Sequence, residues 1–183
     1  QNAFSMCTEC RKYYPEFRVS INLSYVQILK SPLMMELKQM IDHSGISCSG
    51  IIVELTESGY LEGTPAVRSV WNDMKQLRIQ IALDDFGTGY SNLMNISNLE
   101  PDIVKLDRGF TLKALSRSYE YQLMQYVIEM VHKLNQYVCV EGVETKEDLE
   151  KIKALGPDLI QGYYYSKPCS RDEFLKKFFG YSE

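Results

Sequence analysis

Six short apolar segments recur along the chain, and amphipathic helical patterns separate them. This alternation predicts repeated strand–helix units with a parallel sheet, because crossover helices join successive parallel strands. In a parallel barrel the carboxyl ends of the strands meet at one mouth, where active sites lie. We therefore expect the polar residues that end the apolar segments to share one site. These strand-end residues are Asn22, Glu54, Asp84 with Asp85, Lys105, Glu141 and Gln161.

The spacing of the strand ends sets the expected size of the fold. The five intervals between Asn22 and Gln161 average about 28 residues, so eight units would need about 224 residues. The chain has 183 residues, and only a helix is predicted before the first strand. We therefore predict an α/β fold in a single domain over residues 1–183. It would be a modified TIM (β/α) barrel that is incomplete, with about six of the eight strands.

The stretch Ile79–Tyr90, IQIALDDFGTGY, carries the most distinctive strand end. Its apolar run stops at the adjacent carboxylates of Asp84 and Asp85, and a glycine-rich turn follows. One interpretation is an ordinary acidic turn between a strand and a helix. The other is a divalent-cation site, because hard cations prefer carboxylate oxygens. The other strand ends favour the cation site.

Four carboxylates gathered in one mouth would repel one another, and the positive charge of Lys105 balances only one of them. The carboxylates are those of Glu54, Asp84, Asp85 and Glu141. An oxygen-only donor set predicts Mg²⁺ or Mn²⁺ rather than zinc, because no His or Cys accompanies it. Two such ions would activate water against a phosphodiester. Lys105 would orient that water or contact phosphate. Glu141 is a candidate general base or ligand to the second metal.

Composition excludes several classes of partner and site. A net charge of −4 and a pI near 5.3 argue against binding of polymeric nucleic acid. The sequence contains no run of about 18 apolar residues, so no membrane span is predicted. The cysteines are odd in number and scattered, which favours a reduced, cytoplasmic protein, with any membrane anchor outside this segment. They are Cys7, Cys10, Cys48, Cys139 and Cys169.

Local signals place several helix ends. Ser31 followed by Pro32 predicts the start of a helix, with the proline at its first position. Thr145 and Ser170, each with an acidic residue three positions later, predict capping boxes. The run Tyr163–Tyr165 is interpreted as packing on both faces of the last strand, with a platform for stacking bases as the alternative.

Six segments, in chain order, closely resemble those of the EAL-type cyclic di-GMP phosphodiesterases: SINLS, VELTES, LDDFGTGYSNL, DIVKLD, VEGVET and LIQGYYYSKP. The resemblance covers nearly the whole chain. It implies a modified TIM barrel that uses two divalent metals and hydrolyses cyclic di-GMP to the linear dinucleotide pGpG. It further implies bacterial second-messenger signalling, a homodimer, and sensor or cyclase domains in the parent protein.

The resemblance also implies roles for individual residues. Asn22, Glu54 and Asp84 would be ligands of the first metal, and Asp85 and Glu141 would serve the second metal and its water. Glu57, Phe86 and Gly87 would support the loop from Asp85 to Tyr90, which in this family links the site to a dimer contact. The residues that would meet the substrate or its attacking water are Lys105 and Gln161.

The chain departs from the family pattern in one serious respect. The Glu-Ala-Leu motif and its arginine would lie upstream of Gln1, so the chain lacks one metal ligand and is interpreted as N-terminally truncated. We therefore expect this chain alone to be weak or inactive. Val140 in place of a common alanine and Gly109 in place of a common serine look tolerable.

Two other functions stay open from the sequence. One is a receptor that binds cyclic di-GMP without cleaving it, although Asp84, Asp85, Lys105 and Glu141 are all suited to catalysis. The other is a barrel lyase in which Lys105 forms a Schiff base, which the acidic cluster disfavours.

Overall fold

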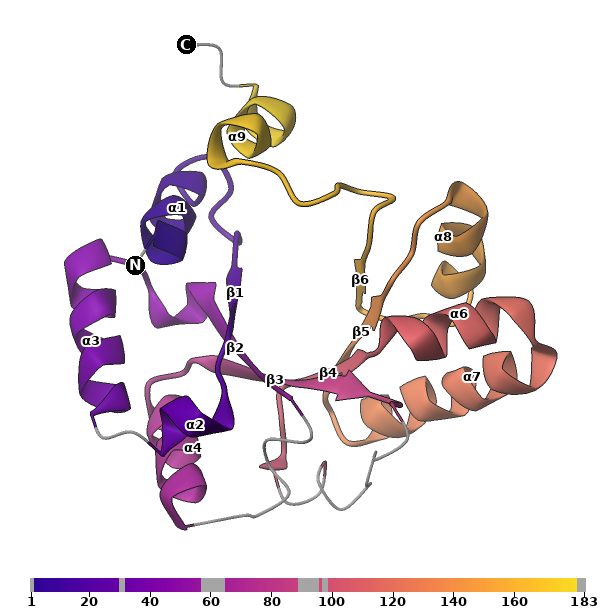
Figure 1. The fold of residues 1–183 in the computed structure, drawn as a ribbon, viewed down its shortest axis with the longest axis horizontal. Helices are drawn as coiled ribbons and strands as arrows, with labels where there is room; N and C mark the ends of the chain where they lie inside the picture. Colours follow the sequence, from indigo (N-terminus) through magenta and orange to yellow (C-terminus); the bar gives the residue numbers. More distant parts are fainter. Residues whose placement is uncertain (1, 30–31, 57–64, 89–95, 97–98, 181–183) are drawn as a thin grey trace.

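A computed structural model describes residues 2–29, 32–56, 65–88, 96 and 99–180. Within this part of the chain, six parallel strands form one sheet in sequence order. The sheet curls into a half-barrel whose two edges are its first and last strands (Figure 1). The predicted α/β fold with six parallel strands is thus confirmed. The strands are β1 (Val19–Asn22), β2 (Ile51–Thr56), β3 (Gln80–Phe86), β4 (Ile103–Leu106), β5 (Tyr137–Glu141) and β6 (Leu159–Gln161).

Helices lie around the outer side of the half-barrel (Figure 1). Among the described residues, no helix is both long enough and apolar enough to cross a membrane. The described cysteines are all free thiols. The helices are α1 (Asn2–Cys10), α2 (Tyr25–Ile28), α3 (Leu33–Ser44), η1 (Cys48–Gly50), α4 (Pro65–Gln76), α6 (Arg108–Ser116), α7 (Ser118–Lys133), α8 (Lys146–Lys153) and α9 (Arg171–Phe179).

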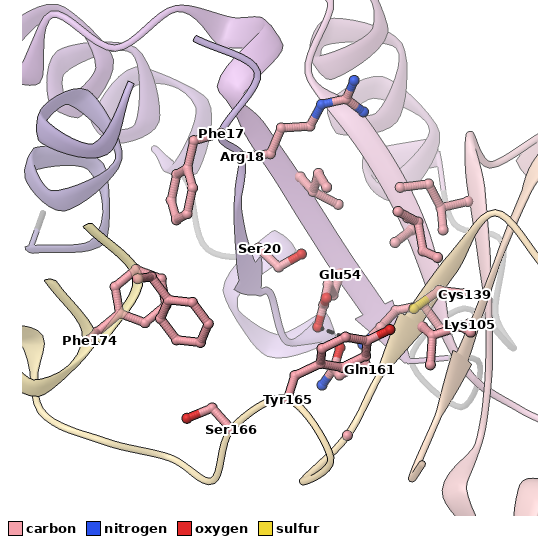
Figure 2. Close-up of a pocket in the computed structure, with 17 residues that line it drawn as sticks. Phe17, Arg18, Ser20, Glu54, Lys105, Cys139, Gln161, Tyr165, Ser166 and Phe174 are labelled. Atoms are coloured by element: carbon pink, nitrogen blue, oxygen red, sulfur yellow. Dashed lines mark ion pairs between the residues drawn. The ribbon is translucent and has the colours of Figure 1, made fainter. Parts of the chain in front are cut away.

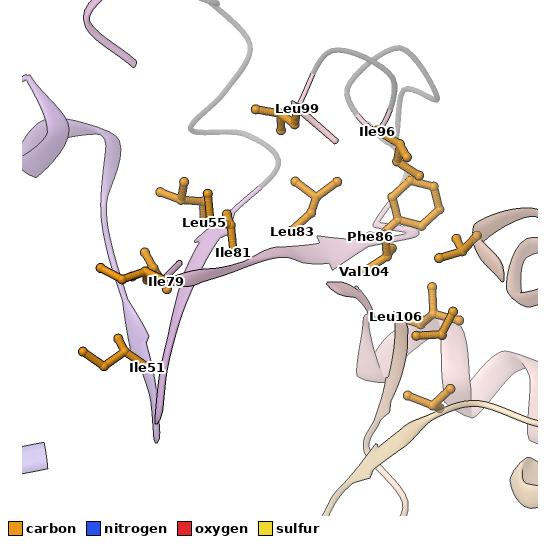
Figure 3. Packing of buried hydrophobic residues seen from close by; sticks show 14 of the residues in the cluster. Ile51, Leu55, Ile79, Ile81, Leu83, Phe86, Ile96, Leu99, Val104 and Leu106 are labelled. Atoms are coloured by element: carbon orange, nitrogen blue, oxygen red, sulfur yellow. The ribbon is translucent and has the colours of Figure 1, made fainter. Parts of the chain in front are cut away.

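Alternate residues of a strand point to opposite faces of the sheet, and in the four central strands both sets of side chains are largely buried. The outer face packs under the helices in one large core (Figure 3). The inner face holds a separate, smaller cluster of buried side chains, one from each of the four central strands. Burial on both sides explains why the strands have nearly continuous apolar sequences. The inner cluster consists of Ile52, Ala82, Ile103 and Cys139.

Helix α9 lies beside α1, at the open side of the half-barrel (Figure 1). The rings of Phe17 and Phe174 meet edge to face with centroids 6.0 Å apart, and those of Tyr13 and Phe179 are 5.8 Å apart. Because Phe17 lies two residues before the start of β1, its contact with Phe174 joins the C-terminal helix to the first edge of the sheet.

The helix signals were partly right. Capping boxes form at both Thr145 and Ser170, as predicted. The helix start at Pro32 was misplaced by one residue: α3 begins at Leu33, and Pro32 is its N-cap, where it makes no side-chain cap bond. Ser31 lies outside the described residues.

The prediction that Tyr163–Tyr165 extend the last strand was wrong. Strand β6 ends at Gln161, and the three tyrosines form a turn in which they are 53%, 40% and 43% exposed. The chain turns because its backbone at residues 161–164 passes over Val143, which lies just after β5. Tyr164 N donates to Val143 O at 3.0 Å, and Val143 N donates to Gln161 O at 3.2 Å.

Candidate active site

The strand pairing and the alternation of side chains along each strand put the predicted site residues of the central strands on the inner face of the sheet, toward the carboxyl ends of the strands. Asn22 is the direct neighbour of Glu54, and Glu141 is the direct neighbour of Gln161. Glu54, Asp84, Lys105 and Glu141 each follow a residue of the inner apolar cluster by two positions, so they share its face of the sheet. A polar layer therefore lies directly above the apolar one, at the carboxyl ends of the strands.

Lys105 lies at the centre of this layer. Its Nζ atom is 3.0 Å from Glu54 Oε2, 3.0 Å from Asp84 Oδ1 and 2.6 Å from Glu141 Oε1. The Lys105 side chain is only 6% exposed. Figure 2 shows the Lys105 and Glu54 side chains converging from their separate strands. The structure thus brings together four of the predicted site residues in a buried ion cluster.

The cluster shifts the pKa values of its members. Burial alone would lower the pKa of Lys105, but the hydrogen bond to Glu141 and the charges of Asp84 and Glu54 raise it well above its usual range. Burial raises the pKa of Glu141, and the Lys105 ammonium only partly offsets that effect. Lys105 is therefore held as a cation. A Schiff-base lysine needs a neutral amine, so the cluster argues against the lyase hypothesis.

A bulge at the end of β3 brings Asp85 toward the same cluster. The register between β3 and β4 shifts between Leu83 and Phe86, and Asp85 has a left-handed backbone with φ 60°. Consecutive residues of a regular strand point to opposite faces, so Asp84 and Asp85 could not both reach the site without such a bulge. Burial raises the pKa of Asp85, and the charges of Asp84 and Asp107 raise it further.

The raised pKa of Asp85 predicts that its charge destabilises the metal-free chain. As the pH rises, the unfolded chain loses this proton first, so stability falls above the unfolded pKa of about 3.9. Asp85→Asn, which tolerates the left-handed backbone, should raise the melting temperature at neutral pH in chelator by about 2 °C or more. The gain should shrink as the pH falls toward that value. Asp42→Asn, at an exposed position, is the control, and an unchanged or lower melting temperature for Asp85→Asn would contradict the prediction.

The remaining predicted residues lie at the margins of the cluster or outside the described chain. Asn22 and Gln161 are both exposed, because β1 and β6 are the edges of the sheet. Phe86 is buried, and a Cβ atom added to Gly87 would lie 2.9 Å from the Phe110 ring, so this glycine packs closely on α6. Glu57 lies outside the described residues.

A cavity of about 540 Å³ opens beside the cluster, inside the half-barrel (Figure 2). Its floor is the apolar inner face, with Glu54 and Lys105 on one wall. Aromatic side chains from the segments next to β1 and β6 and from α9 also line it. They are Phe17, Tyr165, Phe174 and Phe178. The cavity thus combines an apolar body with a few convergent charged groups, as ligand sites do.

The donor set fits a hard divalent cation. Glu54, Asp84, Asp85 and Glu141 offer carboxylate oxygens, and one buried lysine leaves them with an excess of negative charge. Within the described chain, no group of three or more His, Cys, Asp or Glu side chains is arranged around a common metal position. The carboxylates are instead arranged around the Lys105 ammonium.

One feature beside the site was not predicted from the sequence. Arg108 follows Asp107 in the sequence, and its guanidinium donates two hydrogen bonds to Glu144 Oε1. The distances are 2.7 Å from Nη2 and 3.3 Å from Nε. The stem of Arg108 covers Gly142, where an added Cβ would lie 2.4 Å from Arg108 Cγ. This contact ties the end of β4 to the end of β5, next to Glu141. The only sequence signal was the position of both residues just after predicted strand ends.

Comparison with known proteins gives a consistent result. A family model for the EAL domain matches residues 1–168 of the chain. The cyclic di-GMP phosphodiesterase PdeF of Escherichia coli K12 is 30% identical over 168 residues, which are 92% of this chain and 22% of PdeF. The cyclic di-GMP phosphodiesterase PdeL of the same organism is 29% identical over 161 residues, 88% of this chain and 44% of PdeL. The chain therefore spans less than half the length of these relatives.

Solved structures agree with the sequence relatives. The EAL enzyme Bd1971, in its cAMP and cyclic di-GMP bound form, superposes with a TM-score of 0.90 at 27% identity. The match covers 96% of this chain and 49% of that one. The manganese and cyclic di-GMP complex of BlrP1 from Klebsiella pneumoniae superposes with a TM-score of 0.82 at 23% identity, over 93% of this chain and 44% of that one. The BlrP1 likeness shows the fold.

Proposed function

The chain belongs to the EAL domain family, and we propose on that basis that it is part of a metal-dependent phosphodiesterase that hydrolyses cyclic di-GMP to pGpG. The observation that carries the proposal is the buried cluster of Lys105 with Glu54, Asp84 and Glu141 at the carboxyl ends of parallel strands. Its relatives PdeF and PdeL are named as cyclic di-GMP phosphodiesterases.

In the proposed reaction, water attacks one phosphorus atom of the cyclic dinucleotide, and the phosphorus–oxygen bond to a ribose 3′ oxygen breaks. The phosphate stays on the 5′ oxygen of the next nucleotide, and the departing 3′ oxygen takes a proton from water to become a hydroxyl. Glu141 is suited to take the proton of the water, because burial raises its pKa toward the operating pH. Lys105 would orient the water or the phosphate by donating hydrogen bonds from Nζ. Gln161, at the exposed edge of β6, would contact the substrate.

The proposed metal ligands are Asn22, Glu54, Asp84, Asp85 and Glu141. When bound, Mg²⁺ or Mn²⁺ would polarise the phosphate and acidify the attacking water. Asn22 extends this donor set at the β1 edge, next to Glu54 in the register. The homodimer, the attached sensor or cyclase domains and the cytoplasmic location stay predictions.

The proposal is tested by assaying conversion of cyclic di-GMP to pGpG with Mg²⁺, with Mn²⁺ and with chelator. The 183-residue chain is compared with the same chain extended upstream to include the expected Glu-Ala-Leu segment. We expect metal-dependent turnover by the extended chain and little or none by the shorter one. Turnover by the short chain at the extended chain's rate would refute the expected loss of activity. Binding without turnover by the extended chain would favour a receptor.

A further inference from the structure

The Lys105 ammonium occupies the position where three strands deliver their carboxylates. Glu54 comes from β2, Asp84 from β3 and Glu141 from β5, and one oxygen of each lies within 3.0 Å of Nζ. An ammonium can donate three hydrogen bonds. All three can therefore be directed at carboxylates, so the lysine is engaged in the same way as a coordinated cation.

The charges of the cluster make this cation necessary. The side chains of Glu54, Asp84 and Glu141 are 9%, 13% and 18% exposed, so water screens their repulsion poorly. Buried charges that lose their partner are strongly destabilising. Without Lys105 or another cation, these carboxylates would have to protonate or separate.

We propose that Lys105 is the resident cation of the metal-free site, and that a divalent ion enters by taking over carboxylate oxygens that Lys105 now holds. This inference rests on the proposed function, because it concerns the metal of that same site. Metal binding is then an exchange of one cation for another. The ion pairs of Lys105 with the three carboxylates keep the metal-free chain folded. The same ion pairs lower the affinity of the chain for the metal, because the metal must displace them.

Substitution of the lysine separates these two effects. Lys105→Met keeps a long apolar stem and removes the charge, whereas Lys105→Arg keeps the charge. Lys75→Met, which breaks an exposed pair with Glu100, is the remote control. Binding of Mn²⁺ to the 183-residue chain is followed by the electron paramagnetic resonance signal of free Mn²⁺, at mildly alkaline pH so that the carboxylates are ionised.

We expect Lys105→Met to bind Mn²⁺ at least tenfold more tightly than the original chain, and Lys105→Arg and Lys75→Met to bind it about as the original chain does. In chelator, Lys105→Met should melt at a lower temperature, and Mn²⁺ should restore more of its stability than in the other variants. Equal or weaker Mn²⁺ binding by Lys105→Met, with measurable binding by the original chain, would overturn the inference and leave the proposed function standing. Absence of Mn²⁺ binding by every variant of this chain would overturn the inference, whereas the proposed function is decided separately by the turnover assay of the extended chain.

A second measurement uses the original chain, and a variant is needed only to assign the NMR signal of Lys105. In the presence of chelator, the buried Lys105 ammonium should give a ¹⁵N–¹H signal in NMR spectra. Its three carboxylate acceptors slow the exchange of the ammonium protons with water. Added Mg²⁺ should shift or abolish that signal at the concentrations that raise the melting temperature. A Lys105 signal that stays unchanged while Mg²⁺ stabilises the chain would overturn the inference even if Lys105→Met does not fold.

Discussion

In the proposed reaction, Glu141→Gln should abolish hydrolysis of cyclic di-GMP by the upstream-extended chain while leaving the dinucleotide bound. The Glu141 carboxylate lies 2.6 Å from Lys105 Nζ, and burial raises its pKa, so it is the best-placed proton acceptor of the cluster. The amide keeps the shape of the side chain and can accept a hydrogen bond from Lys105, but it cannot take a proton from water. Loss of a general base typically costs about 10²–10⁴ in rate.

The measurement pairs turnover with cyclic di-GMP affinity for the same protein. The control is Glu150→Gln, an exposed carboxylate on α8 that pairs loosely with Lys146 at 3.9 Å. We expect full activity for the control and affinity within tenfold of the original for both variants. The acid side of the pH–rate profile should also report Glu141: activity should fall as the pH drops through an apparent pKa above the ordinary value of 4.5. If Glu141→Gln keeps more than about a tenth of the rate, another residue is the base.

The strand ends could be predicted from the sequence because each combines two independent signals. An apolar run marks a buried strand, and a polar residue at its end, as at Glu54 or Lys105, is costly unless it serves a site. The same signals predicted which residues would meet at one mouth of the sheet. They did not predict that Lys105 would contact three carboxylates at once, because that depends on the relative register of β2 to β5.

Other features could not be predicted because they depend on backbone geometry. Aspartate is only moderately favoured in the left-handed region, so nothing marked Asp85 as the residue that would form a bulge. The Arg108 contact with Glu144 joins residues 36 positions apart, and each alone looks like a surface charge. The run Tyr163–Tyr165 resembled a strand because aromatic residues favour strands. The backbone hydrogen bonds that Val143 makes with Gln161 and Tyr164 override that preference.

Gly162→Ala should be the most destabilising small substitution at the site's edge. A Cβ atom at this position would lie 2.0 Å from Val143 O and 2.5 Å from Val143 N, both backbone atoms. Neither can move away without breaking the hydrogen bonds that Val143 makes with Gln161 and Tyr164. We expect a loss of about 3 kcal/mol or more in the free energy of unfolding, at the upper end for overpacking. The melting temperature should fall by about 6 °C or more.

Gly156→Ala is the matched control, because it tests conformational strain without a clash. Gly156 has φ 75°, and nothing lies within 4 Å of an added Cβ. Its substitution should cost only about 1–2 kcal/mol, the usual cost of a left-handed residue with a side chain. Gly162 carries no such strain, so a larger loss there measures the clash with Val143 alone. Equal stability of the two variants in denaturant would show that β6 can move away from β5 at little cost, and Gln161 would then not be held rigidly against the site.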